Sequence, residues 1–212
     1  STAAGNLADY ASGAVFYSLP GRPAFPIRLT EEMFLRATSH LQQPGRPVCI
    51  YDPCCGSAYH LAVLAYRFWG RLRKIIVSDI DPTAVTLAQR NLGLLTQVGL
   101  EQRTAEIDRS LHLYAKPSHV VALQSAQRLG SILAANLEDH ALDYDAFQAD
   151  GLDRAQVTHG LAGEAPDLVL SDLPYGQLSF WQGESARTLQ SSLPPAQALL
   201  EALAPALPGL LL

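Results

Sequence analysis

The chain has 212 residues, of which 48% are apolar and 17% charged, a composition that builds a folded core and excludes disorder as the main state. No apolar run reaches the ~18 residues that cross a bilayer, and no signal peptide is visible, so we expect a cytoplasmic protein without a membrane partner. The formal net charge of −5 argues against a general nucleic-acid binder.

The charge is unevenly distributed along the chain. Residues 1–100 carry 9 basic and 6 acidic side chains, whereas residues 101–212 carry 6 and 14. An anionic partner is therefore expected to meet the first half of the chain, although ordinary surface variation explains the difference equally well.

We expect a single domain over residues 1–212, with an N-terminal extension over 1–45 and a core over 46–212. The extension is rich in Gly and Pro up to Ile27. Thr30 is the expected N-cap of a helix, because two Glu residues follow it where the first helical turn favours negative charge.

The core alternates short β-branched runs with amphipathic stretches, which is typical of βαβ units. Apolar residues recur at helical spacing over 61–68, and Gly70 is the expected C-cap of that helix. Asp81 and Pro82 are suited to the N-cap and first position of the next helix. The first two strands are predicted at 48–51 and 75–77.

The middle of the chain, about residues 100–143, is interpreted as an enlarged crossover with one helix after Pro117. The alternation of strands and helices predicts a doubly wound, mostly parallel α/β sheet. Because the chain stops inside the fifth strand, we expect the last strands of the domain to be missing; alternatively, the final residues are a frayed tail. The remaining predictions are strands at 144–149, 168–170 and 210–212 and a helix over 195–207.

Carboxylates follow three of the predicted strands. In a parallel sheet, ligands bind beyond the carboxyl ends of the strands. Asp52 begins a turn of small residues that reaches Gly56, where backbone N–H groups can approach a ligand. Asp79 is placed to accept hydrogen bonds from ribose hydroxyls, and Asp150 from an adenine amino group. This pattern predicts a nucleoside-containing cofactor.

The turn after the first strand favours S-adenosylmethionine over a dinucleotide. It holds one glycine, Gly56, where a pyrophosphate needs three. The carboxylate of Asp52 would also repel a phosphate, whereas it suits the ammonium group of a methionine moiety.

The sequence Asp172-Leu173-Pro174-Tyr175 follows the fourth strand and resembles the (Asn/Asp/Ser)-Pro-Pro-(Tyr/Phe) motif of amino- and base-methyltransferases. A planar nitrogen must lose its proton to become nucleophilic, and the Asp172 carboxylate and Leu173 carbonyl can accept it. Tyr175 can stack on the base. The alternative is an ordinary turn after a strand, where Asp and Pro are common. We predict that these four residues are catalytic.

The run Asp52-Pro53-Cys54-Cys55-Gly56-Ser57 resembles motif I of Rossmann-like methyltransferases, with Ala58 in place of its last Gly. This resemblance implies a class I methyltransferase fold with the strand order 3-2-1-4-5. Nearly the whole chain is similar to the avilamycin-resistance family of 23S rRNA guanine methyltransferases. The matching segments are Ser18–Leu29, Ser78-Asp79-Ile80-Asp81-Pro82, Lys116-Pro117-Ser118 and Asp172-Leu173-Pro174-Tyr175-Gly176.

The resemblance implies methyl transfer from S-adenosylmethionine to a guanine of 23S rRNA, at N1, with protection against orthosomycin antibiotics. The partner would be 23S rRNA or the precursor of the large ribosomal subunit, and we expect a monomer. The alternatives are transfer to guanine N2, to another RNA base such as one in tRNA, or to a protein glutamine amide. A further alternative is an inactive module that only binds the cofactor.

Two groups of binding residues complete the prediction. Arg28 is expected to meet the cofactor carboxylate. The predicted cofactor residues are Arg28, Asp52, Pro53, Cys54, Cys55, Gly56, Ser57, Asp79, Ile80, Asp81, Ala149, Asp150 and Gly151, and the predicted RNA contacts are Arg22, Arg71, Arg73 and Trp181.

Three cysteines lie within seven residues, and neither a disulfide framework nor a metal site is expected, although His60 follows Cys55 by five residues.

Overall fold

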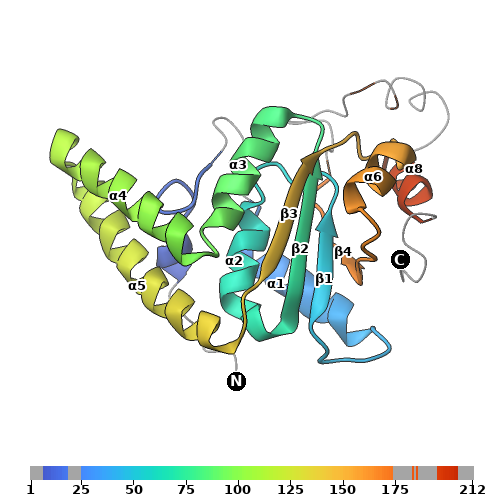
Figure 1. The fold of residues 1–212 in the computed structure, drawn as a ribbon, viewed down its shortest axis with the longest axis horizontal. Coiled ribbons are helices and arrows are strands. Elements are labelled where there is room, and N and C mark those ends of the chain that lie inside the picture. The colour runs from blue at the N-terminus through green and yellow to red at the C-terminus, as the bar shows by residue number, and fades with distance from the viewer. Residues whose placement is uncertain (1–6, 19–24, 174–182, 184, 186–194, 205–212) are drawn as a thin grey trace.

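The computed structural model describes residues 7–18, 25–173, 183, 185 and 195–204. Its centre is a parallel sheet in the order β3-β2-β1-β4 (Figure 1). The predicted α/β class and the order of these four strands are confirmed, while the predicted strand at 210–212 lies outside the described residues. The strands are β1 (Val48–Asp52), β2 (Leu72–Asp79), β3 (Asp143–Gln148) and β4 (Leu168–Val169).

Helices cover both faces of this sheet, because successive strand residues point to opposite sides. Ile50 and Ile75 belong to the larger core, which α1, α2 and α3 cover. Tyr51 and Ile76 belong to the smaller core, which α6 and α8 cover. The bounds are α1 (Ile27–Ser39), α2 (Tyr59–Phe68), α3 (Pro82–Gly93), α6 (Arg154–Leu161) and α8 (Pro195–Leu203).

Two predicted helix ends were wrong. Helix α1 begins at Ile27 after an N-cap at Pro26, so Thr30 lies one turn inside, where its buried hydroxyl donates to the Pro26 carbonyl. Helix α2 is capped by Trp69, because the chain tightens at once into the 3₁₀ helix η2 (Trp69–Arg71) that leads into β2. Gly70 therefore lies inside η2 and is not a C-cap.

The start of α3 matches its prediction. Asp81 is the N-cap, and its side chain accepts a hydrogen bond of 2.8 Å from the Thr83 N–H, with Pro82 in the first turn. Helix α6 was missed, although Asp153 caps it in the same way. Helix α8 covers part of the range predicted as 195–207, whose last residues lie outside the described part.

The enlarged crossover is a hairpin of two helices, α4 (Gln97–Tyr114) and α5 (Pro117–Asp139), where the sequence predicted one helix. Between them Ala115 adopts a left-handed φ of 48°. The hairpin extends from the sheet as an arm (Figure 1). Near the middle of α5 it is tied to the 3₁₀ helix η1 (Leu7–Tyr10), because Arg128 and Ser125 donate hydrogen bonds to the Asp9 carboxylate. None of the described helices is both long and apolar enough to cross a membrane.

Candidate cofactor and methyl-transfer site

The turn after β1 ties three strands together at their carboxyl ends. Asp52 is fully buried, and its Oδ1 accepts hydrogen bonds from the Cys54 N–H (3.0 Å) and the Ser171 hydroxyl (2.5 Å). The Cys55 N–H donates to the Ser78 carbonyl of β2. The segment after β4 that contains Ser171 is therefore joined to the turn that was predicted to hold the cofactor.

Asp79, at the end of β2, holds the same turn from the other side. Its Oδ2 accepts a hydrogen bond of 2.9 Å from the Gly56 N–H, and its Oδ1 accepts one of 3.0 Å from the Asp81 N–H. Gly56 has a φ of 53°, a conformation that glycine adopts without steric cost. Ala58, which replaces the glycine of the motif, also has a left-handed φ of 50°, and this costs a non-glycine residue roughly 1–2 kcal/mol.

Asp150 follows β3 and completes the edge. Its Oδ1 accepts a hydrogen bond from the Leu152 N–H, and the preceding Ala149 N–H donates to the Asp79 carbonyl. A Cβ on Gly151 would lie 3.1 Å from the Pro53 carbonyl, so the two turns are in close contact. The structure thus brings together the cofactor residues predicted after β1, β2 and β3.

Gly183 also lies at this edge. A Cβ on Gly183 would lie 2.6 Å from Asp150 Oδ2 and 2.7 Å from Ile80 Cδ1, and its φ is 96°. Only glycine fits this position without a shift of its neighbours. The predicted list did not contain Gly183, since glycines between β4 and α8 carry no signal of their own in the sequence.

Two buried polar atoms at the site make no hydrogen bond within the described residues. They are Asp52 Oδ2 and His60 Nε2, which lie 3.1 Å apart. The Phe25 ring packs edge-on against His60 at 5.7 Å between ring centroids. The two atoms form an ion pair only when His60 is protonated, and Asp52 Oδ2 accepts no hydrogen bond within the described residues, so it can accept one from a ligand such as an ammonium group. His60 was considered only as a neighbour of the cysteines, and its place beside Asp52 was missed.

Asp172 lies half-buried beyond β4, next to Ser171. Burial raises the pKa of its carboxyl above the usual aspartate value; the charge of His60 opposes this rise and that of Asp52 adds to it. The side chain of Leu173 packs against the smaller core. Of the other predicted residues, Pro174, Tyr175, Trp181 and Arg22 lie outside the described residues.

The predicted arginines do not gather at this site. Arg71 and Arg73 stand at the amino end of β2, at the opposite edge of the sheet from Asp79. Arg71 donates to the Thr38 hydroxyl at 2.9 Å, and Arg73 pairs with Glu164 and Asp167. Arg28 is exposed in the first turn of α1, where no hydrogen bond or ion pair within the described residues joins it to the turn.

All three cysteines are free thiols. Burial raises the pKa of Cys49 to about 11, and burial also raises the pKa values of Cys54 and Cys55. Because the thiolate is the reactive form, these side chains are inert packing groups of the strand and the turn. In the described part of the chain, His, Cys, Asp and Glu side chains nowhere form a group of three that could hold a metal ion.

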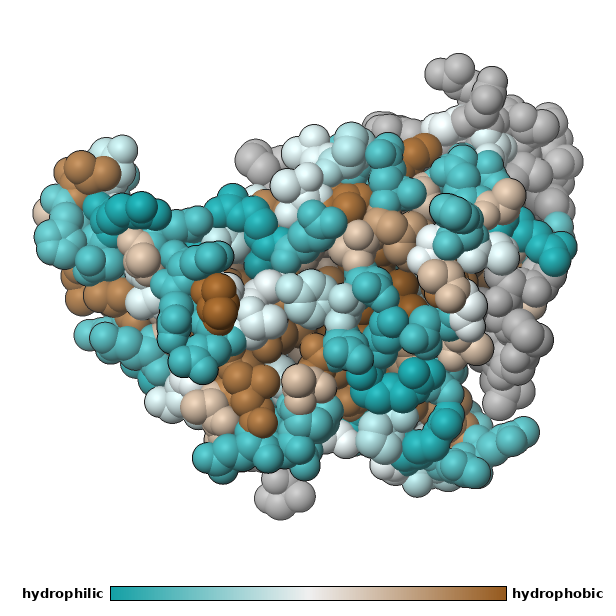
Figure 2. All heavy atoms as spheres, viewed as in Figure 1, coloured by the Kyte–Doolittle hydropathy of each residue, from teal (hydrophilic) through white to brown (hydrophobic). Residues whose placement is uncertain are grey.

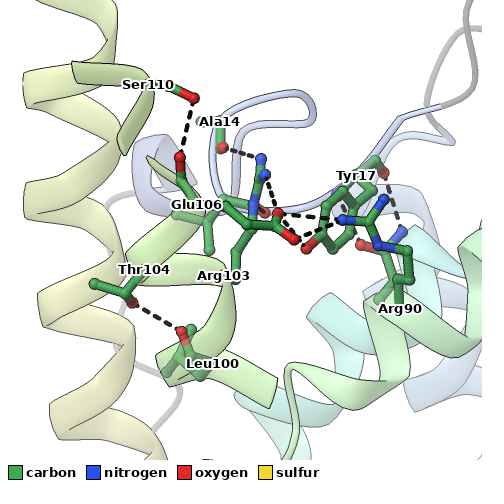
Figure 3. Close-up of polar contacts among 10 residues, drawn as sticks. Ala14, Tyr17, Arg90, Leu100, Arg103, Thr104, Glu106 and Ser110 are labelled. Atoms are coloured by element: carbon green, nitrogen blue, oxygen red, sulfur yellow. Dashed lines mark hydrogen bonds and ion pairs between the residues drawn. The ribbon is translucent and has the colours of Figure 1, made fainter. Parts of the chain in front are cut away.

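Asn91 on α3 joins the N-terminal segment to the turn after β1. Its fully buried amide accepts from the Tyr17 N–H at 2.8 Å and donates to the carbonyls of Tyr17 (3.0 Å) and Ser57 (2.8 Å). The Tyr17 ring lies against the guanidinium groups of Arg90 (3.9 Å) and Arg103 (4.3 Å), which both pair with Glu106 (Figure 3). Sequence reasoning missed this network because 74 residues separate Tyr17 from Asn91.

Asn91→Ala should lower the free energy of unfolding by about 2–3 kcal/mol, because it removes a fully buried amide and leaves the partly buried backbone groups of Tyr17 and Ser57 without their hydrogen bonds. Urea unfolding followed by circular dichroism measures the change. Thr86→Ala on the exposed face of the same helix is the control and should stay within about 0.5 kcal/mol of the parent chain. An unchanged urea midpoint for Asn91→Ala would contradict the role of this network.

A carboxylate that can accept a proton, placed after the fourth strand of a parallel sheet and beside the turn of small residues that follows the first strand, is the arrangement of Rossmann-like methyltransferases, and the present protein is of this class. The family model described as rRNA methyltransferase AviRa matches residues 1–209. The chain therefore belongs to the AviRa rRNA methyltransferase family.

Individual relatives agree with this assignment. The chain is 44% identical over 201 residues to the 23S rRNA (guanine(2535)-N(1))-methyltransferase of Streptomyces viridochromogenes, covering 95% of this chain and 77% of that protein. Two solved structures of the rRNA methyltransferase aviRa from the same organism, at 2.4 Å and 1.5 Å, superpose with a TM-score of 0.83. Both are 42% identical and cover 97% of this chain and 79% of their own.

Proposed function

We propose that this protein transfers a methyl group from S-adenosylmethionine to N1 of a guanine in 23S rRNA. The name of the Streptomyces relative, which is 44% identical, supports the substrate and the position. The observation that carries the proposal is the hydrogen bond from Ser171 to Asp52, because it holds Asp172 beside the turn that would bind the cofactor. We further propose that this modification protects the ribosome against orthosomycin antibiotics.

The residues present fit the cofactor. Asp79 would accept from the ribose hydroxyls, Asp150 from the adenine amino group, and Asp52 Oδ2 from the methionine ammonium. The N–H groups at the start of α2, after Ser57, would face its carboxylate. When bound, the cofactor supplies a methyl group that is already activated by its sulfonium, so the protein contributes position and proton transfer.

Asp172 would accept the N1 proton of the guanine as the N1 lone pair forms the new bond to the methyl carbon. Its raised pKa brings the carboxylate closer to the basicity that a general base needs. The base would have to leave its stack to reach Asp172, and the proposal assigns Tyr175 to stack on it.

Primer extension on 23S rRNA transcripts tests the position of the methyl group. After incubation with protein and labelled S-adenosylmethionine, a methyl group at N1 blocks the pairing edge and should stop reverse transcriptase at one guanine. Label incorporated without a stop would assign N2 instead. Cofactor binding in a calorimeter without any incorporation would identify an inactive binding module and overturn the proposal.

A further inference from the structure

The arm formed by α4 and α5 ends in an exposed cluster that the methyl-transfer site does not use. Of the eight large hydrophobic side chains that are exposed in the described residues, four lie between positions 113 and 121. Leu113 and Tyr114 are 75% and 65% exposed, and Val120 and Val121 are 42% and 57% exposed. Hydrophobic surface is visible at the end of the arm in Figure 2. We call residues 109–121 the arm tip.

Cations without acidic partners accompany these side chains. Among the described residues, neither Arg109 nor Lys116 takes part in an ion pair, whereas Lys74, the other lysine of the chain, pairs with Asp145 and Glu164. The Lys116 ammonium lies 6.0 Å from the centre of the Tyr114 ring. The His119 ring packs against the same Tyr114 ring, with 6.2 Å between the ring centroids.

An exposed aromatic ring beside free cations is the combination that binds nucleic acid, because the ring stacks on a base and the cation neutralises a phosphate. The rest of the arm does not combine these two features. A groove of about 630 Å³ between α4 and α5 is lined by apolar and neutral polar side chains and by two charged residues, Glu101 and Asp108, which are both acidic. Phosphates are repelled there, which favours the arm tip over the groove for an RNA contact.

The arm tip is placed so that one RNA molecule can contact both the tip and the methyl-transfer site. The arm slants away from the sheet toward the side on which the strands end, which is the side that holds Asp52, Asp79 and Asp172 (Figure 1). Its base is held by Arg103, which donates to the carbonyls of Ala14 and Val15 and so fixes α4 against the N-terminal segment. The arm tip thus stands at a fixed place relative to the site.

We propose that the arm tip binds 23S rRNA at a distance from the target guanine, with Tyr114 stacking on an unpaired base and Lys116 contacting a phosphate. This inference rests on the proposed function, since it takes the same RNA as the ligand. It also explains how a chain of net charge −5 can bind RNA, because the contact needs only a local excess of positive charge.

Binding of the intact chain to a fluorescent, unmodified 23S rRNA transcript, measured over a range of salt concentrations, tests the two contacts separately. Lys116→Ala should weaken binding and reduce the slope of log K against log salt by about 0.7–0.9, the value for one phosphate. Tyr114→Ala should weaken binding on the order of tenfold with an unchanged slope, because stacking displaces no counterions. Both side chains are exposed, so thermal unfolding should not change.

Arg36→Ala and Val98→Ala are the matched controls. Arg36 is an exposed cation on α1, and Val98 is 64% exposed at the base of α4, so both should bind RNA like the parent chain. Parental affinity and slope in both tip variants would overturn the inference. So would tip variants that bind naked rRNA normally but lose affinity for ribosomal particles, since that result assigns the tip to a ribosomal protein. Tip-dependent RNA binding without methyl transfer would refute the proposed function alone.

Discussion

Asp172→Asn is expected to lower the rate of methyl transfer by about 10²- to 10⁴-fold, the usual contribution of a positioned general base. The amide keeps the size of the side chain but cannot take the N1 proton. Because no hydrogen bond within the described residues depends on this carboxylate, the fold and cofactor affinity should remain those of the parent chain. Single-turnover transfer of labelled methyl to saturating 23S rRNA measures the loss, and calorimetry measures cofactor binding.

The pH dependence of the same reaction gives a second readout. Burial raises the pKa of Asp172, and transfer needs the ionised form. Activity should therefore be full at neutral pH and fall as the pH decreases through an apparent pKa above the ~3.9 of a free aspartate. This acid limb should disappear from the residual activity of Asp172→Asn. Asp143→Asn, on an exposed carboxylate at the amino end of β3, is the control. A parental rate in Asp172→Asn would remove Asp172 from the mechanism.

Local patterns in the sequence were sufficient to place the strands and the acids that follow them. Buried β-branched runs, and the Asp81-Pro82 pair that starts α3, depend on residues close in the chain. Because the carboxyl ends of parallel strands meet at one edge of a sheet, Asp52, Asp79 and Asp150 could be placed together before the structure was known. The one-glycine turn was equally informative, because Gly56 adopts the left-handed φ that such a turn requires.

Features that depend on distant residues could not be predicted. Helix α4 buries only Leu100 and Ile107, so its sequence carries no apolar stripe, and only the helix after Pro117 was predicted in this crossover. Charge totals indicated that the arginines of the first half would meet RNA, yet Arg73 satisfies its charge within the fold. His60 belongs to the site only because α2 begins directly over Asp52, a geometry that no spacing of residues reveals.

The buried pair Asp52 and His60 leads to the sharpest test of cofactor placement. Asp52→Asn can keep the Oδ1 contacts with the Cys54 N–H and the Ser171 hydroxyl, while its amide nitrogen turns toward His60 Nε2. The turn should therefore fold as before, but a donor replaces the acceptor that would face the methionine ammonium. A hydrogen bond to a charged group is worth about 1.5–3 kcal/mol, so S-adenosylhomocysteine should bind roughly 10- to 150-fold more weakly.

5′-Methylthioadenosine separates this effect from general damage to the site, because it keeps the nucleoside and lacks the amino-acid portion. Its affinity, measured by the same calorimetry, should be equal for the parent chain and for Asp52→Asn. Asp153→Asn is the isosteric control at the same edge of the sheet, since asparagine caps α6 as well as aspartate does. Equal losses of both ligands would mean that Asp52 only supports the turn, and no loss of either would place the ammonium elsewhere.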